Sequence, residues 1–383
     1  MGITKRLNWQ NIFIFLFLIA FPFGQVIKIG ILQPIDLVVG LAAIWMIVKR
    51  LEIPKVYKHI GIFISFAAFS WFFSIFIFRQ VEVVYGLLYL FRIAAYYFFG
   101  VYSWNFVSQK TDNRKLLLDS LLAMSVVSSL FGWVQFFMVP DIKALFVYGW
   151  DIHLFRLIGT FLDPTFLGLI IVFGILTSIT RMIDDKNRRY LGTALFLLTS
   201  LAFTYSRASY LALFAGLIVI AAYKKVIKKA ILFIVIFAAF LFLLPTSKNR
   251  SVELFRTFSA IAKVDNYKTT LQIFSKSPVF GIGYNNMCLA YQKYIGPQDF
   301  TSHSCSGSDS SLLLILTTTG VAGLIVFTFA IGRVIKSLRA KSSFIILSSS
   351  VAALLVHSLF SNSMFYPWVM GYLTILLAIT ARE

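Results

Sequence analysis

The chain has 383 residues, of which 59% are apolar and 13% are charged, and its mean hydropathy is +0.84. A soluble domain averages about 25% charged residues, so this composition excludes a soluble globular protein and indicates a polytopic membrane protein. The 35 Lys and Arg residues outnumber the 15 Asp and Glu residues and give a formal charge of +20. They lie in short clusters between long apolar runs and do not share a soluble face, which argues against a nucleic-acid partner.

The apolar runs predict the fold class. A helix that crosses a bilayer needs about 20 apolar residues, and the sequence offers about 12 such runs. They predict an all-α integral membrane protein with transmembrane helices centred near Leu18, Gly40, Ala68, Leu90, Val127, Val172, Leu198, Phe214, Phe237, Val326, Leu354 and Tyr372. The count depends most on the short run 31–48 and on the break at Ser206 and Arg207, because merging either pair of runs changes it.

The positions of the basic residues predict the orientation. Short cytoplasmic loops carry an excess of Lys and Arg. When the predicted spans alternate, most of the basic residues fall on one side, in the loops near 5–6, 49–58, 110–115, 181–189, 224–229 and 333–341 and at 382. Both termini are therefore predicted to be cytoplasmic. The first run lacks a small-residue cleavage site, so it is interpreted as an uncleaved span.

A long connection on the opposite side divides the chain. We expect transmembrane helices 1–9 over 1–244, a large extracytoplasmic loop over 245–308, and transmembrane helices 10–12 over 309–383. Loops longer than about 15 residues are usually functional or disordered, and the aromatic content of this one favours function. A second extracytoplasmic connection, 140–164, contains Trp150.

Part of the large loop has the pattern of a surface helix. Apolar residues recur at helical spacing from Val252 to Lys276, which predicts an amphipathic helix on the outer membrane surface. Arg256, Lys263 and Tyr267 fall on the opposite stripe. This stripe is either a solvated basic face or a surface that faces an anion.

Three residues near or inside the spans are candidates for polar chemistry. Arg92 lies within a span, where it either contacts a lipid diphosphate or pairs with Asp119 or an acid of another span. Arg207 lies at an outer interface, where a guanidinium either binds phosphate oxygens bidentately or extends to lipid headgroups. His357 lies inside a span and is predicted to be a hydrogen-bonded core histidine.

The end of the large loop contains two candidate bases. Asp309 precedes an apolar run, so it is either a helix N-cap or a general base. His303, six residues earlier, is the alternative base. The four histidines are dispersed, and neither they nor the cysteines have the spacing of a metal site. Upstream, Pro278 stops a helix, and the two glycines of 277–284 allow a tight re-entry.

Cys288 and Cys305 are the two cysteines of the chain, and both fall in the predicted extracytoplasmic loop. Thiols outside the cytoplasm tend to pair. We therefore predict a disulfide between them.

Several motifs, taken in order, resemble the superfamily of O-antigen ligases and O-antigen polymerases, which are bacterial membrane glycosyltransferases. Each motif is loose, but the ordered set is fairly specific and spans about half of the chain. The segments that carry the resemblance are Arg156–Gly168, Thr204–Arg207, Ser277–Tyr284, Asp309–Leu314 and Thr319–Leu324.

The resemblance implies an activity. Such enzymes use neither a metal nor another cofactor, and they act at the outer face of the bacterial cytoplasmic membrane. They move a glycan from an undecaprenyl diphosphate carrier to a hydroxyl of a glycan or lipid A-core type acceptor, within a fold whose outer loop covers the lipid-linked glycan. Alternatives are a multi-pass transporter or flippase of a lipid-linked or polar solute, and a protein O-oligosaccharyltransferase.

The resemblance also implies site residues. Arg207 matches the Ser-Arg position of the family, and Lys263 falls where ligases tend to have an Arg four residues before an aromatic residue. Asp309 stands where ligases usually show His followed by Asn, which makes a polymerase-type member at least as plausible. The implied roles are diphosphate binding by Arg207, Lys263, Arg156, Arg256 and Arg92, base catalysis by Asp309 or His303, and glycan contact by Tyr284, Tyr267 and Trp150.

Overall fold

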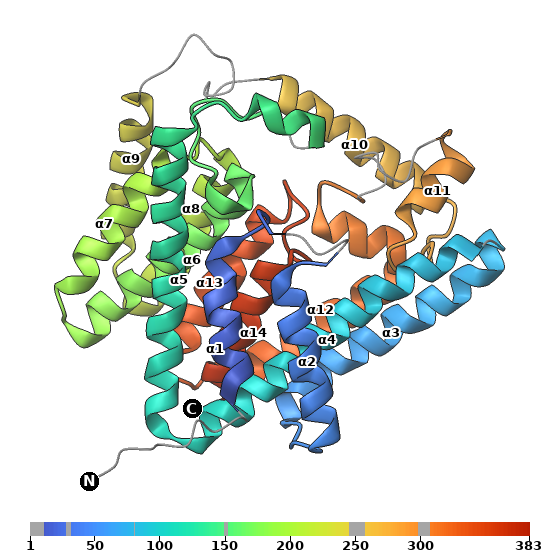
Figure 1. The fold of residues 1–383 in the computed structure, drawn as a ribbon, viewed down its shortest axis with the longest axis horizontal. Helices are drawn as coiled ribbons and strands as arrows, with labels where there is room; N and C mark the ends of the chain where they lie inside the picture. Colours follow the sequence, from blue (N-terminus) through green and yellow to red (C-terminus); the bar gives the residue numbers. More distant parts are fainter. Residues whose placement is uncertain (1–10, 28–31, 80, 149–151, 245–256, 298–306) are drawn as a thin grey trace.

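The computed structural model describes residues 11–27, 32–79, 81–148, 152–244, 257–297 and 307–383 (Figure 1). Within these ranges the chain is helical and forms no β-strand, although an isolated bridge pairs Asp141 with Leu154. Each predicted span centre falls inside a helix. The all-α fold class is therefore confirmed.

Most of the helices coincide with the predicted apolar runs. These are α1 (Ile12–Ala20), α2 (Pro34–Val48), α3 (Lys55–Phe78), α4 (Tyr85–Gln109), α5 (Thr111–Met138), α6 (Pro164–Asp185), α7 (Arg189–Ala202), α8 (Arg207–Lys224), α9 (Ile227–Phe242), α12 (Ser311–Leu338), α13 (Phe344–His357) and α14 (Pro367–Arg382). In the described ranges six helices are long and apolar enough to cross a membrane, namely α3, α4 with the turn before it, α5, α6, α8 and α12. The count of twelve spans stays a prediction.

Shorter elements occupy the connections. The region between α9 and α12 contains α10 (Phe258–Phe274) and α11 (Met287–Tyr294). Four 3-10 helices complete the described structure, namely η2 (Phe21–Phe23), η3 (Val81–Val84), η4 (Lys143–Tyr148) and η5 (Gly159–Phe161). The predicted break at Ser206 and Arg207 is confirmed, because α7 ends at Ala202 and α8 begins at Arg207.

The core lies around α6, the most buried of the six long helices. Phe173 of α6 packs on Tyr372 of α14, and Phe161 packs on Trp368, all of them fully or almost fully buried. The helix α13 packs against α8 and α6, while α14 packs against α4. The pair of α3 and α4 runs obliquely away from this core, with α12 against α3 (Figure 1).

The connections gather at two ends of the molecule. At one end, Arg114 after α4 pairs with the side chain of Glu383 and donates a hydrogen bond to Ser343, between α12 and α13. At the other end, the Thr160 hydroxyl donates to the carbonyl of Pro22 at 2.6 Å. We call the second end the loop end; it holds 21–27, 139–148, 152–163, 203–206, 257–297 and 358–366.

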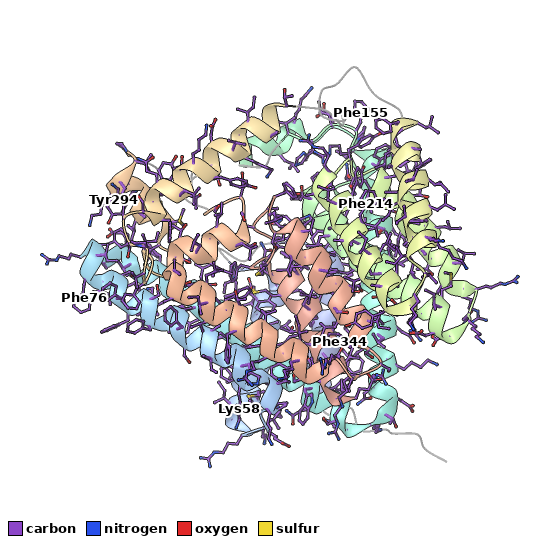
Figure 2. The ribbon with its side chains drawn as sticks, turned by 180° about the vertical axis from the view of Figure 1, so that it is seen from behind. Lys58, Phe76, Phe155, Phe214, Tyr294 and Phe344 are labelled. Atoms are coloured by element: carbon purple, nitrogen blue, oxygen red, sulfur yellow. The ribbon has the colours of Figure 1, made fainter. Side chains whose placement is uncertain are left out.

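These contacts join segments that the alternation of spans places on the same side of the membrane. Figure 2 shows Lys58 at the end opposite to Phe155 and Tyr294, which belong to the loop end. The helices α10 and α11 also lie at the loop end, at the top of Figure 1. The structure thus fits the predicted alternation of the chain.

The helix α12 is broken where the 277–284 segment enters. Gly320 has φ 71° and ψ −177°, outside the helical region. The freed backbone groups exchange hydrogen bonds of 2.9 to 3.2 Å with the entering segment, in which Ile282 and Gly283 donate to Thr317 and Thr318, and Val321 and Ala322 donate to Pro278 and Val279. Irregular backbone at membrane depth requires such internal partners, because lipid offers none.

Glycine is required at this break for a steric reason. A Cβ atom on Gly320 would lie 2.1 Å from the carbonyl oxygen of Val279 and 2.6 Å from the nitrogen of Gly281. We expect Gly320→Ala to destabilise the protein by about 3 kcal/mol or more, because it adds this clash to a backbone conformation that only glycine adopts easily. Thermal unfolding in detergent, followed by loss of the monodisperse gel-filtration peak, measures the effect.

Gly332→Ala is the matched control on the same helix. In the described part of the chain, no atom lies within 4 Å of a Cβ built on Gly332. This change should therefore leave stability unaltered or raise it by up to about 1 kcal/mol through helix propensity. Equal behaviour of the two variants would contradict the interlocked arrangement.

Candidate functional site

The candidate site is built around the turn that follows α13, residues 357–363, which we call the hub. Lys263 of α10 donates a hydrogen bond from its ammonium group to the carbonyl of Phe360. Tyr267, one helical turn later, donates its hydroxyl proton to the carbonyl of Leu359. The polar stripe of α10 therefore faces the hub.

The start of α12 reaches the same turn. The backbone N–H of Ser311 donates to the carbonyl of Ser358 at 2.9 Å, and the Ser311 hydroxyl contacts Asn362 at 3.2 Å. These bonds place Asp309, two residues before Ser311, beside α10. Thus α10, the first residues of α12 and the last residue of α13 converge at the loop end.

An ion pair forms the centre of the arrangement. The Lys263 Nζ atom lies 3.8 Å from Asp309 Oδ2, and the two side chains are 34% and 45% exposed. Asn266, which lies between Lys263 and Tyr267 on α10, accepts the backbone N–H of Asp309 at 2.8 Å. The cation and the carboxylate are thus held side by side and remain open to solvent.

The N-cap role considered for Asp309 is wrong. The cap of α12 is Ser310, whose hydroxyl accepts the backbone N–H of Leu313. The Asp309 carboxylate instead faces Lys263. Serine is an equally good capping residue, so the structure leaves the carboxylate available for chemistry.

Tyr267 adds a hydroxyl donor to the site. Burial, together with the nearby Asp309 carboxylate, raises the pKa of the Tyr267 hydroxyl from its ordinary value of 10.0. The phenol therefore stays protonated at neutral pH, and it continues to donate its hydrogen bond to the hub.

The interpretation of the polar stripe of α10 as a solvated basic face is wrong for its described members, Lys263 and Tyr267. Both bind the hub, whereas the apolar residues Ile261, Val264 and Leu271 are 59%, 49% and 46% exposed. Asp265 and Lys268, with side chains 64% and 74% exposed, lie among these apolar residues on the outward side. The predicted amphipathic pattern, with an apolar face for the membrane, is therefore wrong for the described part of the helix. Arg256 and the predicted start of the helix at Val252 lie outside the described residues.

Arg207 is the first residue of α8, at the loop end, and its side chain is half-buried. The preceding Ser206 caps the helix by accepting the backbone N–H of Ser209. A cation at a helix N-terminus gains nothing from the helix dipole. Its position there is therefore not explained by the stability of the helix.

Arg156, predicted to bind diphosphate, has a structural role in the described conformation. Its side chain is 6% exposed. Its Nε and Nη2 atoms donate to the carbonyls of Thr204 at 2.8 Å and Tyr205 at 3.2 Å. It therefore holds the turn before α8, where Tyr205 has the unfavourable φ of 49°, and so helps to present Arg207.

Arg92 forms an ion pair inside the bundle. Its Nη2 atom lies 2.9 Å from a carboxylate oxygen of Asp36 on α2, and Tyr96 donates to the other oxygen at 3.2 Å. Asp119 pairs with Arg181 instead. The alternative that Arg92 pairs with an acid of another span is therefore confirmed, and this pairing neutralises the charge that a diphosphate would need.

The predicted glycan-contacting residues differ in accessibility. Tyr267 belongs to the site described above, whereas the Tyr284 side chain is 6% exposed and packs edge-on against Phe365. Tyr284 therefore presents no free ring face for sugar stacking in this structure. Trp150 and the alternative base His303 lie outside the described residues.

The disulfide is a separate, testable feature of the loop. Cys288 lies in α11 and is disulfide-bonded, while Cys305 lies outside the described residues, so their pairing stays a prediction. We expect no mass shift when the unfolded protein is alkylated without reductant, and two alkyl groups after reduction. A bridge of this loop length adds about 3 kcal/mol under the chain-entropy model; alkylation without reductant would refute it.

An apolar cavity of about 370 Å³ lies between α3, α4, α12, α13 and α14. It extends from Met364 and Phe365, directly after the hub, to Phe344 at the opposite end of α13. The backbone N–H of Met364 donates to the Ser311 hydroxyl at 3.1 Å. The cavity therefore begins next to the candidate site and continues along the membrane-crossing helices.

Sequence reasoning missed two polar groups. Asn266 holds the chain before α12, and Ser209 is hydrogen-bonded to His357. The prediction of a hydrogen-bonded core histidine is confirmed, since His357 is fully buried between Ser209 and Ser363. The spacing of Ser206 and Ser209 at a helix start is a signal that could have pointed to this place.

Comparison with known proteins gives a family match. The family model described as O-antigen ligase matches residues 192–328, from α7 into α12. The matched stretch contains Arg207, Lys263, Asp309 and the interlocked segment around Gly320. The resemblance inferred from the motifs is thus confirmed. No curated protein matches the chain significantly.

Proposed function

From the O-antigen ligase domain carried by residues 192–328, we propose that the protein transfers a glycan from a lipid diphosphate carrier to an acceptor hydroxyl. The observation that carries the proposal is the Lys263–Asp309 pair at the hub. A cation for the leaving group and a carboxylate for the incoming hydroxyl lie together, at the end of the bundle where the connections are longest.

The donor is an undecaprenyl diphosphate-linked glycan. Lys263 and Arg207 bind the diphosphate, because ammonium and guanidinium groups neutralise the charge that develops on it as it leaves. The apolar cavity beside the hub has the lining that an isoprenoid chain requires. The site faces the extracytoplasmic side, as the distribution of basic residues predicts.

Asp309 acts as the general base. The acceptor hydroxyl oxygen attacks the anomeric carbon of the donor, the bond from that carbon to the diphosphate oxygen breaks, and the hydroxyl proton passes to the Asp309 carboxylate. Undecaprenyl diphosphate leaves with the electron pair. Positioned bases of this kind accelerate reactions by ~10²–10⁴.

The ion pair gives the steps an order. Before the donor arrives, Lys263 and Asp309 neutralise each other at 3.8 Å. A diphosphate that binds Lys263 competes with the carboxylate, because it carries more negative charge. Asp309 then becomes free to accept a proton. Base activation is in this way coupled to donor binding.

The acceptor distinguishes two members of the superfamily. A ligase transfers the glycan to a lipid A-core type acceptor, and a polymerase transfers it to a second lipid-linked glycan. Asp309 followed by Ser310 replaces the His-Asn pair that is usual in ligases. This difference favours a polymerase-type activity as the first to be tested.

Reconstituted vesicles test the proposal. Purified protein is supplied with an undecaprenyl diphosphate-linked oligosaccharide, alone or with lipid A-core, and the products are separated by size. Longer glycans without added core indicate polymerisation, and a modified core indicates ligation. Movement of the donor across the membrane without either product would overturn glycan transfer in favour of transport.

A further inference from the structure

The start of α8 is linked to α13 and to the hub through hydrogen bonds of one buried histidine. His357, the last residue of α13, is fully buried, and its Nε2 atom lies 3.3 Å from the Ser209 hydroxyl oxygen. Its Nδ1 atom lies 2.5 Å from the hydroxyl of Ser363, the last residue of the hub. The ring thus spans from α8 to the hub.

The hydrogen bonds around His357 form a continuous chain when the protons are placed as follows. The Ser209 hydroxyl donates to the carbonyl of Thr165 at 3.2 Å, since a carbonyl only accepts. The Ser206 hydroxyl, 2.8 Å away, then donates to Ser209. His357 donates from Nε2 to Ser209 and accepts from Ser363 at Nδ1, as a neutral imidazole can. The Ser363 hydroxyl has a second acceptor in the carbonyl of Ser361 at 3.3 Å, and this assignment follows its shorter contact, to Nδ1 at 2.5 Å.

This chain ends at the residue that precedes Arg207. Ser206 caps α8, so its orientation sets the direction in which the first residue of the helix leaves the turn. Arg156 holds the same turn from the other side, through the carbonyls of Thr204 and Tyr205. Three buried polar side chains and one buried arginine therefore hold the turn that leads into Arg207.

We propose that His357 is a positioning residue, which fixes Arg207 relative to the hub that binds Lys263. The proposal rests on the function proposed above. Lys263 donates to Phe360, and the backbone N–H of Phe360 donates to the carbonyl of His357 at 3.0 Å. His357 therefore bonds through its side chain to α8, which carries Arg207, and through its backbone carbonyl to the hub, which Lys263 contacts. In this way it sets the separation of the two cations for the two phosphates of the donor.

Binding of undecaprenyl diphosphate to the purified full chain in lipid nanodiscs tests this role. We expect His357→Leu to weaken binding about tenfold, because an apolar side chain of similar size breaks both hydrogen bonds. His357→Gln should recover most of the affinity, since an amide both donates and accepts. Ser209→Ala, which removes the other partner, should weaken binding to a similar degree and provides a second variant.

A double-mutant cycle separates positioning from general stability. If His357 acts through Arg207, then Arg207→Ala combined with His357→Leu binds no more weakly than Arg207→Ala alone. Additive losses would overturn the proposal. Ser350→Ala is the control, because Ser350 is buried on the same helix and its hydroxyl has no hydrogen-bond partner among the described residues. The affinity of this variant should equal that of the wild type.

The outcomes distinguish this role from the function itself. Wild-type protein that does not bind undecaprenyl diphosphate overturns the diphosphate donor and the role of His357 together. Wild-type binding that is lost in Arg207→Ala but unchanged in His357→Leu and Ser209→Ala overturns only the role of His357.

Discussion

Arg207→Ala is expected to reduce glycan transfer by about a hundredfold or more, without loss of membrane insertion. Removal of one preorganised group that stabilises developing negative charge typically costs ~10²–10³ in rate. The side chain is half-buried at the first position of α8, so truncation leaves the capping bond of Ser206 in place. Transfer assayed in vesicles, with protein amount and insertion measured in parallel, gives the result.

Two further variants sharpen the test of Arg207. Arg207→Lys keeps the charge but loses the planar fork of donors, so we expect an intermediate rate if the guanidinium binds phosphate oxygens bidentately. Arg188→Ala removes an exposed arginine beside α7, at the end opposite to the site, and should leave transfer unchanged. Near-normal product from inserted Arg207→Ala protein would remove Arg207 from the site.

Asp309→Asn should slow turnover at saturating donor by ~10²–10⁴, because an amide cannot take the proton from the hydroxyl group of the acceptor sugar. The change keeps the size of the side chain, and the cap of α12 is unaffected because Ser310 supplies it. It also frees Lys263 from its ion pair. The KM for the donor should therefore stay equal or fall, while kcat falls.

Lys263→Ala is the complementary variant, since it removes a donor ligand and leaves the carboxylate. Its main effect should be a higher KM for the donor, so the two variants separate binding from proton transfer. His303→Ala must be measured beside Asp309→Asn, because His303 is the alternative base. If neither change slows turnover at saturating donor, the assignment of a base in this loop is wrong.

The fold was largely predictable from the sequence because membrane-crossing helices leave a strong signal. Long apolar runs follow from the transfer of side chains into lipid, and the basic clusters follow from the excess of Lys and Arg in short cytoplasmic loops. Even the break between Leu198 and Phe214 could be placed, because Ser206 and Arg207 interrupt the run at a helix start. Helix length was less predictable. Some helices, such as α1 and α7, are shorter than a membrane-crossing helix needs to be, so the number of spans stays a prediction.

The site was predictable only in part, because side-chain direction depends on neighbours that are distant in the chain. The sequence marks Lys263 and Tyr267 as one stripe, but nothing local says that the stripe faces the hub, about a hundred residues later. The contact of His357 with Ser209 spans 148 residues. In the sequence, Arg156 cannot be told from an arginine that binds phosphate. Its structural role is visible only in its burial and in its hydrogen bonds to the carbonyls of Thr204 and Tyr205.

The break at Gly320 also bears on how this loop can vary or be exchanged between related proteins. Residues 277–284 and the middle of α12 complete each other's backbone hydrogen bonds, so neither segment is a self-contained module. A chimera that takes only the loop from a related protein would place a new segment against the unchanged α12, and their backbone hydrogen bonds would no longer match. We infer that 278–283 and 317–322 must be exchanged together, because each segment supplies the backbone partners of the other.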